Sequence, residues 1–280
     1  MRPKHPNIKY QLSVGDRLSI RTLCVALTTI DPSWKADHTT DSFWRLYINN
    51  RSGAMIRSDH GDHELIPGQV HLIPGWVTYS CLNKQNIGHF YIHFDVVGIP
   101  PALIRQVFDR PFMLNADPIR DKAFMALCDQ IEDGDTSSAA VLCRCKSLLY
   151  WAFTDLLMQL PKSKTQLCDQ AMAAQQAVQP AVQYIDEHYH TNTTNTQLAS
   201  LCHMSEDYFI RRFRECVGQT PAQYVQERRI SEAAKQLIYT QNAIDQIAHD
   251  TGFGNRFYFS RVFNKHYDMG PATYRKRQRV

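Results

Sequence analysis

Two arginines stand in the same local sequence, fifty positions apart. Arg211 follows the pair Tyr208-Phe209 by two positions, and Arg261 follows Tyr258-Phe259 by two positions. A guanidinium group can donate two hydrogen bonds at once to O6 and N7 of guanine, so arginine is well suited to reading a base edge in the major groove of DNA. On a single helix, such arginines would be interpreted as a solvated face. Their occurrence in two matched copies favours base readout.

The two arginines belong to a longer internal repeat. Pro221-Ala222-Gln223-Tyr224 returns as Pro271-Ala272-Thr273-Tyr274, and upstream Leu198-Ala199 corresponds to Ile247-Ala248. Each copy contains a first helix, a tight turn and a second helix, which is the helix-turn-helix pattern. The sequence therefore predicts an all-α region with two helix-turn-helix motifs in the C-terminal part of the chain.

The second helix of each copy has an apolar and a polar face. Phenylalanines four residues apart, Phe209 with Phe213 and Phe259 with Phe263, should face the core. The residues expected to cap the free amides at the helix starts are Ser205 and Asn255. The opposite stripe, which can meet DNA, carries Asp207, Ile210, Arg211 and Arg214 in the first copy and Arg256, Phe257, Ser260, Arg261 and Asn264 in the second.

The segment from about Leu198 to Arg275 resembles the DNA-binding region of the AraC/XylS family of bacterial transcription regulators, in which a long helix joins two helix-turn-helix motifs. The residues that carry the resemblance are Ile247-Ala248, Gly252-Phe253, Tyr258-Phe259-Ser260-Arg261-Val262-Phe263, Pro271, Tyr274-Arg275 and, in the connecting helix, Arg229-Ile230, Ala233 and Leu237. Asp268 replaces the glycine that the family has in its last turn, and Gly270 replaces a Ser or Thr cap. Aspartate tolerates a left-handed backbone and glycine is an acceptable cap, so both changes are compatible with the fold.

The resemblance implies which residues contact DNA. The base-reading positions are Asp207, Ile210 and Arg211 in the first motif and Arg256, Phe257, Ser260 and Arg261 in the second, and Ser205 and Arg214 complete the predicted set. Asp207 could accept a hydrogen bond from a cytosine amino group or stabilise the helix N-terminus, and the second role is preferred. Phe257 has two alternatives of equal weight, contact with a thymine methyl group or packing in a partly buried position.

The N-terminal half is predicted to be rich in strands. From Leu18 to about Val97, short runs of alternating apolar residues are separated by turns. Two helical patterns follow, at about 118–131 and 138–160, and the polar segment 161–179 suits a linker. The expected fold is α+β in two domains: a cupin-like antiparallel β-barrel with a helical pair at 1–160, the linker at 161–179, and the all-α double helix-turn-helix domain at 180–280.

One motif in this half resembles the cupin barrel. Gly68, Pro74 and Asn83 are in register with the second conserved cupin motif. Tyr79 stands where metal-binding cupins have a histidine, and Trp76 stands where they have a second glycine. The alternative metal ligands His60, His63 and Glu64 lie in a turn and lack the usual downstream partner. We therefore expect neither a metal nor another cofactor.

A barrel without a metal, with aromatic and hydrogen-bonding side chains, resembles the ligand-sensing domain of sugar-responsive members of the AraC/XylS family. The aromatic and hydrogen-bonding side chains available for recognition are Trp44, Tyr47, Arg57, His71, Trp76, Tyr79, Tyr91 and His93. Ordinary packing is the alternative role for each of them. The ligand-binding prediction takes six: His71, Trp76, Tyr79, Trp44, Tyr91 and His93.

These observations predict a sequence-specific transcription regulator that binds double-stranded promoter DNA and responds to a small-molecule effector, with a sugar as the first candidate. The resemblance adds RNA polymerase as a candidate partner and a homodimer formed through the helical pair. The alternatives are a metal-independent cupin enzyme, a repair methyltransferase and an architectural DNA-binding protein. The two enzymes lack recognisable acid/base or activated-cysteine motifs, and the architectural protein leaves the barrel unexplained.

The composition agrees with an intracellular, non-membrane protein. The 280 residues carry a formal net charge of +4, which by itself does not separate a nucleic-acid binder from an enzyme. Eight scattered cysteines without a CxxC pair are expected to be reduced. No run of apolar residues is long enough to span a membrane, and residues 1–10 lack the apolar core of a signal peptide. The expected location is the cytoplasm.

Overall fold

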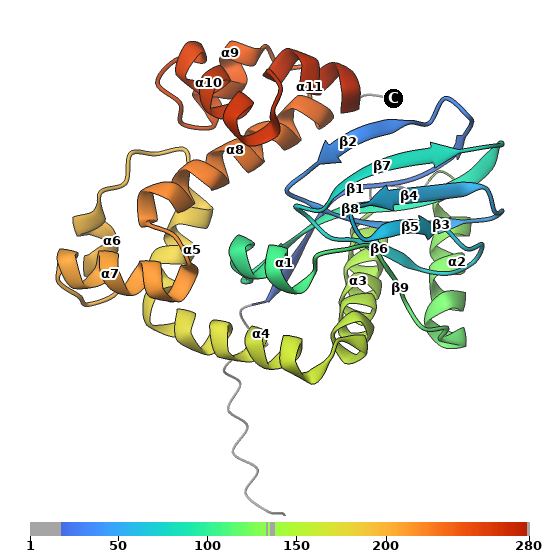
Figure 1. The fold of residues 1–280 in the computed structure, drawn as a ribbon, viewed down its shortest axis with the longest axis horizontal. Coiled ribbons are helices and arrows are strands. Elements are labelled where there is room, and N and C mark those ends of the chain that lie inside the picture. The colour runs from blue at the N-terminus through green and yellow to red at the C-terminus, as the bar shows by residue number, and fades with distance from the viewer. Residues whose placement is uncertain (1–17, 133, 135–137, 279–280) are drawn as a thin grey trace, which may run out of the picture.

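The computed structural model describes residues 18–132, 134 and 138–278. Its N-terminal half contains two antiparallel sheets, and its C-terminal half is helical (Figure 1). The strands are β1 (Ser19–Ile30), β2 (Ala36–Thr40), β3 (Trp44–Asn49), β4 (Ala54–Ser58), β5 (Gly61–Glu64), β6 (His71–Ile73), β7 (Thr78–Asn83), β8 (Ile87–Val97) and β9 (Phe112–Met113). Residues 1–10, considered above for a signal peptide, lie outside the described part of the chain.

The strands form one sheet in the order β1-β8-β3-β6-β9 and a second in the order β2-β7-β4-β5. Because side chains alternate across a strand, β3 sends Trp44, Leu46 and Ile48 into a core shared with the helices, while Tyr47 joins the core between the sheets. The antiparallel prediction is confirmed. The closed cupin barrel stays a prediction, since the two sheets are hydrogen-bonded separately.

Helices cover the outer face of the five-stranded sheet. They are α1 (Pro101–Val107), α2 (Pro118–Glu132) and α3 (Ala139–Gln159), and the last two contact β1. The Ser138 side chain accepts a hydrogen bond from the Val141 amide and so caps the start of α3. The helical pair therefore occurs where the sequence places it. Helix α4 (Lys162–Gln175) then leads from the sheets toward the C-terminal half (Figure 1).

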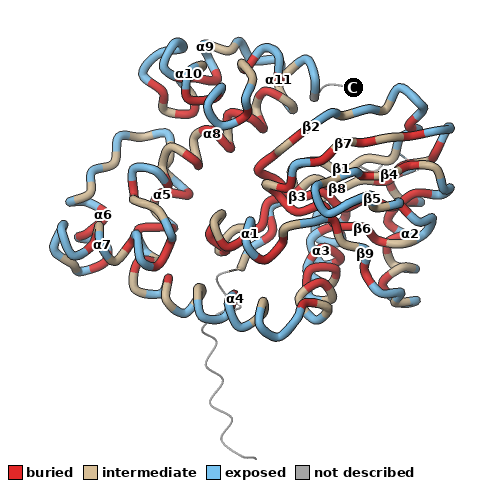
Figure 2. Tube along the Cα trace, in the orientation of Figure 1, coloured by how far each residue is buried: buried red, intermediate tan, exposed pale blue. Residues whose placement is uncertain are grey.

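The C-terminal half consists of two similar helical units joined by one long helix. The first contains α5 (Gln179–His188), α6 (Asn195–Leu201) and α7 (Glu206–Val217), and the second contains α9 (Ile244–Asp250), α10 (Arg256–Tyr267) and α11 (Pro271–Gln278). Helix α8 (Pro221–Tyr239) joins them and is buried along much of its length (Figure 2). Each unit has its own core, around Phe209 and Phe213 in the first and around Phe259 and Phe263 in the second. In the described part of the chain, no helix is long and apolar enough to cross a membrane.

Candidate DNA interface and inter-sheet cavity

The two helix-turn-helix motifs have the same turn geometry. His203 and Gly252 occupy equivalent positions, and both have a positive φ, 55° and 83°. In each turn the next residue donates back to the alanine of the first helix, Met204 to Ala199 at 3.0 Å and Phe253 to Ala248 at 2.8 Å. The repeat in the sequence is therefore a repeat in backbone conformation.

The two second helices also end alike. Gly218 and Asp268 are both left-handed, with φ of 82° and 51°. Asp268 thus adopts the conformation that its place in the motif requires. At the helix starts the copies differ: the Asn255 side chain accepts from the Tyr258 amide at 2.8 Å, whereas the Ser205 side chain makes no capping hydrogen bond. The expected cap is confirmed for Asn255 and is wrong for Ser205, whose exposed hydroxyl stays available to another partner.

The two candidate base-reading arginines are held in the same way. The guanidinium of Arg211 lies over the ring of Tyr208, and that of Arg261 lies over Tyr258, both at 5.4 Å from the ring centroid. Tyr208 and Tyr258 are themselves exposed. A cation–π contact limits the freedom of a long side chain without neutralising it. Both guanidinium groups are therefore presented outward on the second helices.

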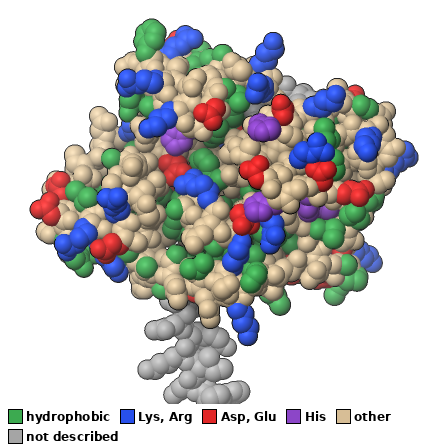
Figure 3. Space-filling model, in the orientation of Figure 1, with side chains coloured by type: hydrophobic (Ala, Val, Ile, Leu, Met, Phe, Trp, Pro, Cys, Tyr) green, Lys and Arg blue, Asp and Glu red, His purple; other side chains and the backbone are tan. Residues whose placement is uncertain are grey.

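Most of the predicted DNA-binding residues lie on the exposed faces of α7 and α10. Ile210 and Ser260 are partly buried, and the exposed members are Ser205, Asp207, Arg211, Arg214, Arg256, Phe257 and Arg261. Arg256 also approaches Asp245 at 3.3 Å on the surface. Basic and acidic side chains are mixed over the face shown in Figure 3, so charge alone does not mark the interface. Base contact by each of these residues stays a prediction.

A cavity of about 390 Å³ lies between the two sheets. Its wall comes from β1, β3 and β8 on one side and from β7 on the other, and exposed Lys35 and Arg277 lie at its solvent side. We call it the inter-sheet cavity and define it by Arg45, Tyr47, Tyr79, His89, Tyr91 and His93, with Thr28, Thr29, Trp34 and Cys81.

Burial sets the protonation states in the inter-sheet cavity. It lowers the pKa of His89 to about 3 and holds the pKa of His93 well below its ordinary value. It also raises the pKa of Tyr91 to about 12 and that of Tyr79 far above its ordinary value. At neutral pH the cavity therefore presents neutral imidazoles and phenols, which are suited to hydrogen-bonding a polar ligand between aromatic walls.

Three of the six predicted ligand-binding residues, Tyr79, Tyr91 and His93, line the inter-sheet cavity. The other three lie elsewhere. The ring of Trp44 packs among Phe108 and Phe153 under the helices, and Trp76 lies beneath the guanidinium of Arg105. His71 contacts His63, with 2.9 Å between Nδ1 and Nε2. No group of three metal-binding side chains occurs among the described residues.

The sequence prediction missed Arg45 and His89 and passed over Tyr47. A signal for them exists in the alternation of two strands. On β3 and β8 the apolar stripe packs on the helices, so the intervening residues face the other sheet. The register pairs these residues across the strands: Arg45 with His93, Tyr47 with Tyr91 and Asn49 with His89.

Comparison with known proteins shows what this chain resembles. A family described as a helix-turn-helix domain matches residues 198–277. The raffinose operon regulatory protein RafR of Pediococcus pentosaceus is 24% identical over 260 residues, which span 87% of this chain and 88% of RafR. The regulatory protein SoxS of Salmonella typhimurium is 36% identical over 106 residues, which are 38% of this chain and 99% of SoxS.

The chain belongs to the AraC family of transcription regulators. It is thus a DNA-binding regulator rather than an enzyme. The crystal structure of ToxT from Vibrio cholerae shares its fold, with a TM-score of 0.53 and 13% identity over 94% of this chain and 98% of ToxT. That likeness extends over both the sheets and the helical half.

In this AraC-family chain, the inter-sheet cavity is connected to the second helix-turn-helix unit. Asp41, which is 1% exposed, accepts from the guanidinium of Arg45 and from the hydroxyl of Tyr274 in α11. The Tyr239 hydroxyl at the end of α8 lies 2.5 Å from Nδ1 of His93. Two side chains of the cavity wall therefore contact helices of the DNA-binding half through at most one intermediate residue.

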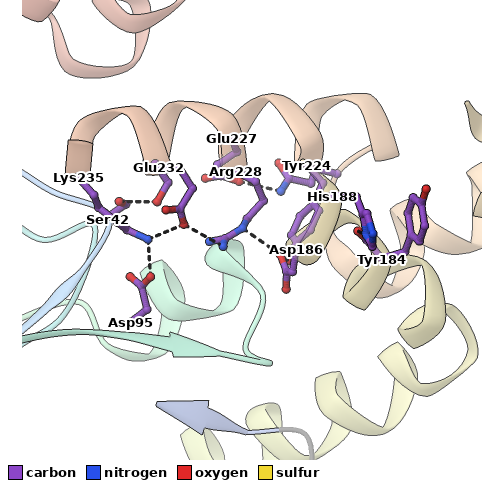
Figure 4. Close-up of polar contacts among 12 residues, drawn as sticks. Ser42, Asp95, Tyr184, Asp186, His188, Tyr224, Glu227, Arg228, Glu232 and Lys235 are labelled. Carbon is purple, nitrogen blue, oxygen red and sulfur yellow. Dashed lines mark hydrogen bonds and ion pairs between the residues drawn. The ribbon is translucent and has the colours of Figure 1, made fainter. Parts of the chain in front are cut away.

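Helix α8 is also attached to the sheets and to α5 by buried charges (Figure 4). Lys235 contacts Asp95 of β8 and, at 2.8 Å, Glu232, and Arg228 contacts Glu232 at 3.2 Å and Asp186 at 2.9 Å. All five side chains are at most 17% exposed. Among these ion pairs, Lys235–Asp95 holds α8 against the N-terminal half and Arg228–Asp186 holds it against α5, both with little access to solvent.

Proposed function

We propose that this regulator reads promoter DNA with α7 and α10 and adjusts its activity to a small molecule bound in the inter-sheet cavity. The proposed division is a sensing domain at 1–160, a linker at 161–179 and a DNA-binding domain at 180–280. In the DNA-binding domain, Arg211 and Arg261 each contact a guanine, and the exposed Ser205 hydroxyl contacts a phosphate. One monomer then reads two successive major grooves about 34 Å apart.

The single observation that carries the effector proposal is the position of Asp41. This buried carboxylate is shared between Arg45, which lines the cavity, and Tyr274, which belongs to the last helix of the DNA-binding domain. A ligand that recruits the guanidinium of Arg45 must change the environment of Asp41, and hence the hold on Tyr274. A ligand that contacts His93 likewise competes with Tyr239. Effector binding and domain docking are thereby coupled.

A sugar is the effector class that we propose to test first. The cavity offers hydroxyl, imidazole and guanidinium groups between aromatic rings, which suits a polyhydroxylated ligand. The name of the relative RafR points to a sugar operon, and it supports the same choice. We further propose a cupin-like barrel, a homodimer through α2 and α3, and contact with RNA polymerase, as the family resemblance implies.

A thermal-shift screen of the full-length protein against mono- and oligosaccharides tests the effector proposal. A ligand present at 100 times its Kd stabilises the folded state by about 2.7 kcal/mol. Stabilisation of this size raises Tm by a readily measured amount. His93→Ala should abolish this rise, whereas His60→Ala, an exposed histidine outside the inter-sheet cavity, should preserve it. If a ligand raises the Tm of both variants as much as that of the unmodified protein, it binds outside the inter-sheet cavity.

A further inference from the structure

Phe257 is an exposed aromatic side chain on the helix proposed to read DNA. It is 86% exposed, more than any other large hydrophobic side chain in the described ranges, whereas Phe259 and Phe263 of the same helix are fully buried. The packing role that the sequence left open is therefore excluded among the described residues. Because its phenyl ring is not used in the core, the side chain is available for an apolar contact outside the folded chain.

We propose that Phe257 recognises the 5-methyl group of a thymine in the half-site read by α10. In the major groove, most of what a base edge presents is a hydrogen-bond donor or acceptor. The exception is the 5-methyl group of thymine, which is apolar. A phenyl ring has no donor or acceptor for the polar edges or for phosphate. Thymine is thus the base that offers the phenyl ring of Phe257 a favourable contact. The inference rests on the proposed reading of DNA by α10.

The neighbours of Phe257 direct it toward DNA rather than toward another protein. Arg256 precedes it and Arg261 follows one turn later, and all three are exposed. Residues four apart share a helix face and are separated by about 6 Å along the axis, which is less than two base steps. If Arg261 contacts a guanine, the thymine recognised by Phe257 lies within about two base pairs of it.

The first motif cannot make the same contact. The position equivalent to Phe257 is Asp207, an exposed carboxylate in the first turn of α7. The stacked arginines at 211 and 261 are the same in both motifs, so the half-sites should share a guanine. They should differ beside it, with a methyl-dependent thymine in the half-site of α10 alone. The operator is then an imperfect direct repeat.

Replacement of thymine by deoxyuridine removes only the methyl group, and it tests the proposal directly. The operator is first selected from a random duplex library with full-length protein, and each thymine near the shared guanine of the α10 half-site is then replaced singly. Affinities are measured by fluorescence anisotropy at fixed salt. One replacement should weaken binding about fourfold, the value of one buried methyl group.

Two variants assign that loss to a side chain. Phe257→Ala should weaken binding to the thymine duplex and bind the thymine and deoxyuridine duplexes equally, because the methyl group has lost its partner. Arg261→Ala should bind both duplexes more weakly but keep the fourfold difference. An undiminished difference in Phe257→Ala, or no sensitive thymine in a selected operator, overturns the assignment of Phe257 alone. Failure to select any operator overturns the proposed DNA reading as well.

Discussion

Replacement of Lys235 by methionine should destabilise the protein and cause its two halves to unfold in separate transitions. The Lys235 side chain is 6% exposed and lies between Asp95, 7% exposed, and Glu232, 17% exposed. Methionine keeps most of the apolar stem but removes the ammonium group. Asp95 is then left buried without its cation, and breaking one side of a buried pair costs about 3–5 kcal/mol.

The loss should be recovered when the partner charge is also removed. In the double variant Asp95→Asn/Lys235→Met no uncompensated charge remains on β8, while Glu232 keeps its contact with Arg228. We expect a coupling energy of about 2–3 kcal/mol between the two sites. Lys122→Met, an exposed lysine of α2, is the matched control and should change the free energy of unfolding by less than about 0.5 kcal/mol.

Urea unfolding followed with two probes measures these changes. The four tryptophans lie at positions 34, 44, 76 and 151, so their fluorescence reports on the N-terminal half, while far-UV circular dichroism is dominated by helices, many of them C-terminal. In Lys235→Met the two transitions should move apart, because the interface no longer couples the halves. Additive single effects, with coupling below about 0.5 kcal/mol, would refute the argument that the Lys235–Asp95 pair joins them.

Three further predictions address the DNA contacts, the cavity and the link between them. Arg261→Ala should cost about 1–3 kcal/mol on the selected operator and much less on a scrambled duplex, with exposed Arg51→Ala as the neutral control; equal losses on both duplexes would make Arg261 a phosphate contact. Because burial lowers the pKa of His89 from 6.5 to about 3, the unfolded chain takes up a proton that the folded chain refuses, so this group opposes folding increasingly as the pH falls below 6.5. His89→Gln should therefore reduce the slope of unfolding free energy against pH by up to about 1.4 kcal/mol per unit between about pH 6 and 4, and an unchanged slope in urea titrations would contradict the buried neutral imidazole. Tyr274→Phe removes the hydroxyl held by Asp41, a bond to a charged group worth about 1.5–3 kcal/mol, and should shift the DNA Kd of the ligand-free protein by about tenfold; a Kd within twofold of the original would show that docking of α11 does not influence DNA binding.

The sequence by itself determined the two helix-turn-helix motifs of the DNA-binding half. Helix-turn-helix units are short and local, so their apolar spacing, turn residues and caps stand within a few positions of one another and can be read from the chain. The left-handed Asp268 and the Asn255 cap follow from such local chemistry. The exposure of Phe257 does not follow from local chemistry, because the same local sequence would allow a distant segment to pack against this side chain and bury it.

In the N-terminal half, the sequence determined the alternation of strands but only the tertiary structure decided which stripe faces which layer. Trp44 and Arg45 are neighbours, yet one packs under the helices and the other lines the inter-sheet cavity. An aromatic residue suits either environment, so composition does not choose between them. The contact between Asp41 and Tyr274 joins residues 233 positions apart, and Lys235 meets Asp95 across 140 positions. Neither pairing leaves a local pattern, because each depends on how two separately patterned halves come together.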